Sequence, residues 1–127
     1  MKFVLAPEIN PELRRIVDRL GLSHIKPEKI VSFKSFGSKG RSVARIWSLP
    51  RIWQIALNKE AHYCLELISE RFDRLSSSEK EKVLIHELLH IPRNFSGALL
   101  PHRHHSRRID RRTVEKWHAK LYVKWGK

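Results

Sequence analysis

The chain has 127 residues, with 26 Lys or Arg against 13 Asp or Glu, which gives a formal net charge of +13. This length fits one compact domain over residues 1–127 and leaves no room for a second one. The single cysteine, Cys64, excludes an intramolecular disulfide and suits a reducing compartment. The apolar run at residues 3–6 is too short for a signal peptide, and no stretch reaches the length of a membrane span. We therefore expect a cytoplasmic protein.

The order of the predicted elements indicates an α+β fold. Asn10 as N-cap, Pro11 at the first helical position and Gly21 just after the end frame a first helix. The segments after it are predicted as a hairpin of strands at 30–36 and 42–47, an ambiguous segment at 52–57, a strand at 62–68, and a last helix at about 110–125. A helix, a small mixed sheet, a central helix and a C-terminal helix make a minimal zincin-like layout.

The central helix carries the most specific motif, His86-Glu87-Leu88-Leu89-His90, which fits the pattern HExxH. Two histidines four residues apart lie on the same helical face and can bind one Zn²⁺ together. The glutamate after the first histidine can act as general base on a zinc-bound water. The alternative is a surface helix that happens to expose two histidines.

Two overlapping capping boxes, Ser76 with Glu79 and Ser78 with Glu81, predict where this helix begins. Pro92 predicts its end near Ile91, so the helix spans about residues 77–91. Its apolar residues form one stripe opposite the two histidines: Leu84, Ile85, Leu88, Leu89 and Ile91. One face is therefore predicted to pack in a core while the other presents metal ligands.

A catalytic zinc needs a third protein ligand and an open position. The candidates are the loop histidines His102, His104 and His105, or a carboxylate on the last helix, for which Glu115 is the one downstream glutamate. A histidine-rich tract can also be a loose surface metal binder or a solvated loop.

The segment Ile85-His86-Glu87-Leu88-Leu89-His90-Ile91-Pro92, with Phe95-Ser96-Gly97 and Pro101-His102 after it, resembles an uncharacterised family of small metallopeptidases from archaea and phages. More distantly, the chain is similar to SprT-like proteases and other compact zincins. The resemblance implies one Zn²⁺ per chain with His86, His90 and His102 as ligands and Glu87 as base. His105, His104 and Glu115 stay open as alternatives for the third ligand.

The implied activity is hydrolysis of peptide bonds by an activated water. Zincins align their substrate along an edge strand, for which 62–68 is the candidate here. Tyr63 and Arg103 are candidates to assist the oxyanion. Glu66 is either a partner that orients a histidine or a solvent-facing strand residue.

Positive charge is concentrated in the C-terminal region, at about residues 107–127. Six of its cationic residues are candidates for nucleic-acid binding: Arg107, Arg108, Arg111, Arg112, Lys116 and Lys120. SprT-like proteases act near DNA, which favours the same partner, but a solvated helix face explains the charge equally well. Three functions thus remain: a zinc peptidase acting on protein or peptide, a nucleic-acid binder or nuclease that uses the same metal site, and a catalytically silent zinc module.

Overall fold

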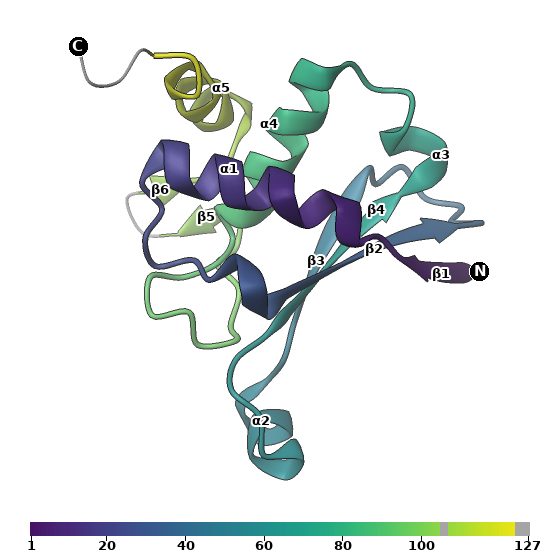
Figure 1. Cartoon of the computed structure of the whole chain (residues 1–127), viewed down its shortest axis with the longest axis vertical. Helices are drawn as coiled ribbons and strands as arrows, with labels where there is room; N and C mark the ends of the chain where they lie inside the picture. Colours follow the sequence, from purple (N-terminus) through teal and green to yellow (C-terminus); the bar gives the residue numbers. More distant parts are fainter. Residues whose placement is uncertain (105–106, 124–127) are drawn as a thin grey trace.

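A four-stranded mixed sheet organises the computed structural model, which describes residues 1–104 and 107–123 (Figure 1). The strands lie in the order β1-β2-β4-β3; β2 and β4 are parallel, and the two other pairs are antiparallel. The elements are β1 (Lys2–Leu5), α1 (Asn10–Leu20), β2 (Ile30–Phe36), β3 (Ala44–Ser48), α2 (Arg51–Leu57), β4 (Tyr63–Ile68), α3 (Ser69–Phe72), α4 (Ser77–Leu88), β5 (Arg103–His104), β6 (Arg107–Arg108) and α5 (Arg111–Lys120). The predicted α+β fold is confirmed.

The position of β4 corrects two of our predictions. β2 and β3 do not form a hairpin, because β4 lies between them and pairs with both. β4 is also not an edge strand, although we expected it to align the substrate. Its residues are buried from Leu65 to Ile68. In the centre of the sheet these residues are shielded from water, whereas at an edge they would be exposed. The edges of the sheet are β1 and β3.

Helix α1 packs as its sequence predicts, with one difference at its start. Gly21 ends the helix in the left-handed conformation at a φ of 66°. The apolar residues of one side are buried: Leu13, Ile16, Val17 and Leu20. Asn10 is the first helical residue and does not cap the helix. Its amide instead donates to the carbonyl oxygens of Ile30 and Pro27, at 2.9 and 3.3 Å, and so ties α1 to the start of β2.

The ambiguous segment at 52–57 is helical and forms α2, which connects the two antiparallel strands β3 and β4. Pro50 precedes the helix, and Asn58 ends it in the left-handed region at a φ of 55°. The helix projects from the end of the sheet, away from the other helices (Figure 1). Within α2 only Gln54 is buried, and Ile52 is 74 % exposed.

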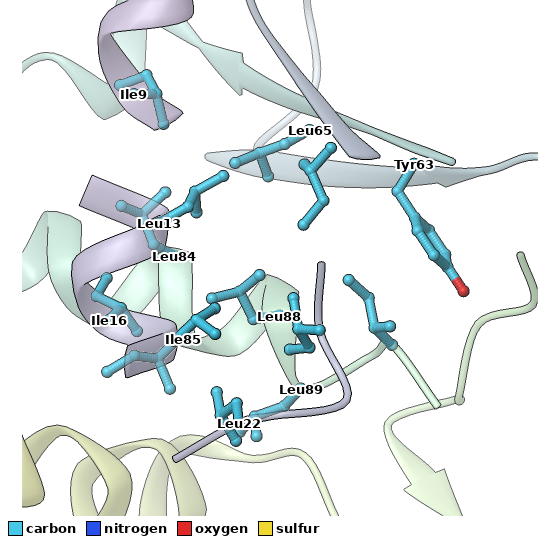
Figure 2. Packing of buried hydrophobic residues seen from close by; sticks show 14 of the residues in the cluster. Ile9, Leu13, Ile16, Leu22, Tyr63, Leu65, Leu84, Ile85, Leu88 and Leu89 are labelled. Atoms are coloured by element: carbon cyan, nitrogen blue, oxygen red, sulfur yellow. The ribbon is translucent and has the colours of Figure 1, made fainter. Parts of the chain in front are cut away.

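The core lies between the sheet and the helices α1 and α4. Leu13 and Ile16 from α1 meet Leu84 and Ile85 from α4 beneath Leu65 of β4 (Figure 2). Each fully buried aliphatic side chain contributes about 1.5–3 kcal/mol. Helix α5 packs against α4 with its buried Val114, and Leu121, directly after the helix, is buried as well. In the described part of the chain, no helix has the length and apolar composition needed to cross a membrane.

Candidate metal centre

Helix α4 begins at a capping box, as predicted, but one box forms and not two. The Glu79 amide donates to Ser76 Oγ at 3.1 Å, and the Ser76 amide donates to Glu79 Oε1 at 3.2 Å. Glu81 instead accepts hydrogen bonds from Arg15, His118 and Tyr122 and so links α4 to α1 and α5. The predicted apolar stripe of α4 is buried in full.

The helix ends earlier than predicted, at Leu88 and not at Ile91. The next turn is tighter, because the amides of His90 and Ile91 donate to the carbonyls of Glu87 and Leu88, three residues back. His90 therefore lies in this tightened turn, with its ring still on the side of His86.

Three histidines meet at this end of α4. His86 Nε2 lies 3.2 Å from His102 Nε2 and 3.4 Å from His90 Nε2, and the candidate ligand atoms of all three lie within 4.8 Å of one another. Tetrahedral zinc with Zn–N bonds of about 2.0–2.1 Å places two ligand nitrogens roughly 3.3 Å apart. Two of the three nitrogen pairs thus have the spacing expected around one ion of this kind, and the third pair lies within the same 4.8 Å.

His90 is oriented by the loop that carries His102. Its Nδ1 donates to the carbonyl of Leu100 at 2.5 Å, and the Leu100 amide donates to the carbonyl of His90 at 2.7 Å. With the proton on Nδ1, the lone pair of Nε2 is directed at the other two histidines. The same pair of bonds fixes the loop two residues before His102.

The loop itself is held by Tyr63 of β4. The Tyr63 hydroxyl accepts from the Gly97 amide at 2.9 Å and donates to the Ala98 carbonyl at 2.7 Å. The sequence made Tyr63 a candidate to assist the oxyanion. Its hydroxyl instead forms both of these hydrogen bonds to the loop. Its role was missed because the contact joins residues 35 positions apart.

Gly97 is the residue in the sequence that indicates a close approach of this loop to Gln54 and Leu49. It adopts a φ of 93°, and an added Cβ would lie 2.3 Å from Gln54 Nε2 and 2.4 Å from the Leu49 carbonyl. Gln54 in turn donates to the carbonyls of Leu49 and Ser96, both at 2.8 Å. Only glycine allows this close approach of the loop to α2.

The electrostatics of the centre favour neutral histidines beside a carboxyl that titrates near neutrality. Burial, with the nearby His90 and His102, lowers the pKa of His86 to about 4. Burial also lowers the pKa of His90, against the opposing effect of its bond to Leu100. Burial alone raises the pKa of Glu87 to about 7, and no hydrogen bond to its carboxylate is present among the described residues. Neutral imidazoles are the form that binds a metal.

The histidines open into a cavity of about 390 Å³ beside the edge strand β3. Its lining combines the first half of β3, the end of α4 and the loop: Ser42, Ala44, Arg45, Ile46, His86, Glu87, His90, Leu99, Leu100 and His102. The residues of β3 thus border the space in front of the histidines.

The other candidates for the third ligand lie elsewhere or outside the described residues. Glu115 accepts from Lys82 at 3.0 Å and is not part of the histidine cluster. His105 lies outside the described residues, as do the side chains of His104 and Arg103.

Glu66 has neither of the two roles considered for it. It is 1 % exposed and accepts hydrogen bonds from Ser35 at 2.6 Å, from Trp47 at 2.9 Å and from Arg45 at 3.3 Å. The carboxylate therefore binds the edge strand β3 to the rest of the sheet and orients no histidine.

The residues predicted to bind nucleic acid lie on α5 and directly before it. Arg112, Lys116 and Lys120 follow one another at four-residue spacing on the exposed side of the helix, opposite the buried Val114. Arg111 instead lines a cavity next to Glu87. Arg108 is exposed just before the helix, and the side chain of Arg107 is outside the described residues.

Comparison with known proteins gives one match. The family model described as "Putative phage metallopeptidase" matches residues 1–122, which is nearly the whole chain. No curated protein and no solved structure matches it. The match confirms the resemblance read from the histidine motif and agrees with a histidine cluster that can hold a metal ion. The chain therefore belongs to this family of phage metallopeptidases.

Proposed function

We propose that the chain is a zinc-dependent peptidase in which His86, His90 and His102 bind the ion and Glu87 is the general base. One observation carries the proposal. Three imidazoles, with two of their nitrogen pairs at the spacing of a tetrahedral site, lie next to a buried carboxyl in a cavity beside an edge strand. Three protein ligands and an open position are typical of catalytic zinc, whereas structural sites are closed by four.

The donor set suits zinc. Among the described residues, the histidine cluster consists of three imidazoles with no thiolate or carboxylate, and imidazole is a common ligand of zinc. When bound, the ion would polarise the substrate carbonyl and make a coordinated water acidic near neutral pH.

Glu87 supplies the proton transfer. Its burial raises the pKa of the carboxyl to about 7, so near neutral pH it can both accept a proton and return it. It follows His86 directly in the sequence and lines the same cavity, so the proton acceptor and one ligand come from the same helix. We propose that Glu87 takes a proton from the attacking water and then donates it to the leaving amine.

Strand β3 would align the substrate. It pairs with β4 on one side only, and Ala44 and Ile46 line the cavity of the histidines. An extended peptide can add to such an edge through backbone hydrogen bonds, which require no particular side chains. The edge strand that we assign to the substrate is therefore β3, in place of the 62–68 strand predicted from the sequence.

The experiment compares zinc-loaded wild type with Glu87→Gln on a mixture of unstructured peptides, with products identified by mass spectrometry. Loss of a general base costs about 10²–10⁴-fold in rate. We expect such a loss in Glu87→Gln with full zinc content, and none in the control Glu12→Gln, whose carboxylate pairs with Arg15 on α1. Equal turnover by wild type and Glu87→Gln would refute the proposal.

Nucleic-acid binding is the second candidate function, favoured by the stripe of Arg112, Lys116 and Lys120. These side chains form no ion pair with a carboxylate within the described residues, although the chain pairs several of its other cations. Fluorescence anisotropy with a duplex DNA tests it. Phosphate contacts predict binding that weakens steeply with salt and falls further in Lys116→Glu. Binding that is unchanged in this variant would refute the role of the stripe.

A further inference from the structure

A second cavity, of about 390 Å³, lies beside the histidines between α4, α5 and the start of β3. It shares Ala44, His86 and Glu87 with the cavity of the metal centre, so the two hollows join at the general base. Its volume is at the lower end of the roughly 300–1,000 Å³ of pockets that hold small ligands. A group placed in it would lie directly next to the bond that Glu87 acts on.

The walls of this cavity are aliphatic. Val43, Leu75 and Val83 pack against the core yet remain half-exposed, and Val114 of α5 is buried behind them. Val83 lies on α4 one helical turn before His86, so it is on the side of the ligands. An apolar group that covers this surface gains free energy, because both lose contact with water. A charged group would lose its hydration here without gaining a polar partner from these aliphatic walls.

The charged residues of the cavity leave little attraction for a charged ligand. Lys82 pairs with Glu115 at 3.0 Å, and Glu79 is held in the capping box of α4. Arg111 is the cation of the cavity that has no carboxylate partner among the ion pairs of the described residues. An acidic group bound by Arg111 is therefore the alternative that the test must separate.

We infer that this cavity binds an aliphatic side chain of the substrate, such as that of Leu, at the residue next to the bond that is cleaved. The inference rests on the proposed function and deepens it, because it names the side chain that the peptidase selects. Val83 and Val114 determine this specificity, and β3 holds the backbone of the same peptide.

The first test measures binding without turnover. The compounds N-acetyl-leucinamide, N-acetyl-alaninamide and N-acetyl-aspartamide are titrated into zinc-loaded wild type, and the valine methyl resonances are followed by NMR. We expect the leucine compound alone to shift the methyls of Val83 and Val114. The shift of the Val114 methyls should vanish in Val83→Phe, which fills the cavity, and both shifts should persist in Val4→Phe, a matched change on β1, whose Val4 is exposed. Stronger binding of the aspartate compound, or no binding at all, would overturn the inference.

The second test measures cleavage of peptides that differ at one position, Leu, Ala or Asp. One or more methylenes in an apolar pocket change kcat/KM by about 10–200-fold, so the Leu peptide should lead by at least tenfold. Val83→Phe should remove this preference and still cleave the Ala peptide, with its zinc content unchanged. A Leu preference that survives in Val83→Phe would overturn the inference. Methyl shifts without cleavage of any peptide would instead refute the peptidase and with it the assignment of the cavity to a substrate.

Discussion

The metal centre has two halves that are held in different ways. The helix half is α4 with His86 and Glu87, together with the tighter turn that carries His90, and the loop half is the segment 92–102 with His102. A capping box, a buried apolar stripe and the bonds of Glu81 to α1 and α5 hold the helix half. The loop half has little regular structure and depends on Tyr63 and Gln54, which reach it from 35 and 42 positions away.

This difference explains what each half contributes. Helix α4 and the tighter turn after it fix two of the proposed ligands and the proposed base relative to one another, because one turn of helical backbone sets their spacing. The loop brings the third proposed ligand, and its position follows from side-chain and backbone bonds that can be removed one at a time. We therefore expect changes in the loop half to weaken metal binding without unfolding the chain, and changes in the helix half to affect stability.

The largest effect is expected for His90→Ala, which damages both halves. It removes a ligand and also the donor to the Leu100 carbonyl. Zinc affinity, measured by competition with a chelator, should fall on the order of a hundredfold or more. His86→Ala is the matched change, since it removes a ligand and leaves the loop bond in place. Metal-free His90→Ala should be less stable than metal-free His86→Ala by about 1–3 kcal/mol, and equal stability would contradict the role of the loop bond.

Tyr63→Phe should separate the halves most clearly. The substitution leaves the amide of Gly97 and the carbonyl of Ala98 without their buried partner, while His86 and His90 stay in place. We expect zinc affinity to fall about 10–100-fold, as for other residues that position a ligand. Tyr122→Phe removes a hydroxyl bonded to Glu81, far from the loop, and should leave the affinity unchanged. Equal affinities of the two variants would show that Tyr63 does not position His102.

A smaller effect, on stability alone, is expected at Glu81 of the helix half. Burial by itself would raise the pKa of Glu81, but hydrogen bonds from Tyr122, His118 and Arg15 outweigh it and keep this pKa below its ordinary value. Folding therefore favours the carboxylate. The stabilisation is fully present above the pKa of an unfolded glutamate, about 4.3, and is lost as the pH falls through the lower folded-state pKa.

Urea denaturation of the metal-free chain between pH 6 and pH 3 checks this sign. Glu81→Gln should be less stable than wild type at pH 6, and the two should converge toward pH 3 because wild type loses its advantage there. A stability difference that stays constant over this range would contradict the assignment. The zinc affinity of Glu81→Gln should equal that of wild type, because no bond of Glu81 reaches the loop.

The smallest effect is expected at the start of α4. Ser76→Ala removes the capping hydroxyl that accepts from the Glu79 amide and should cost about 1 kcal/mol of stability. Ser78→Ala is the matched control, since Ser78 lies inside the helix and should cost little. Thermal unfolding of both variants measures the difference. A larger loss of stability in Ser78→Ala than in Ser76→Ala would show that Ser76 is not the N-cap of α4.

The two halves also differ in how far the sequence predicts them. Helix α4, its capping box at Ser76 and the shared face of His86 and His90 follow from residues within a few positions of one another. The choice of His102 among the candidates for the third ligand required the resemblance, because loop geometry depends on Tyr63 and Gln54, which are distant in the chain. The predicted pairing of the strands was wrong for the same reason. Turn signals at 37–40 predicted a hairpin of β2 and β3, but β4, which is buried, lies between them.

The central claim is that His86, His90 and His102 together hold one metal ion, and elemental analysis tests it most directly. Wild type, His86→Ala, His102→Ala and His62→Ala are purified without an affinity tag, loaded with zinc and dialysed. His62 lies outside the cluster, with its Nδ1 against the Glu60 carbonyl, and serves as control. We expect about one zinc per chain in wild type and His62→Ala, and loss of zinc in the other two variants. A wild type without zinc, or a His102→Ala variant that keeps it, would refute this three-histidine site.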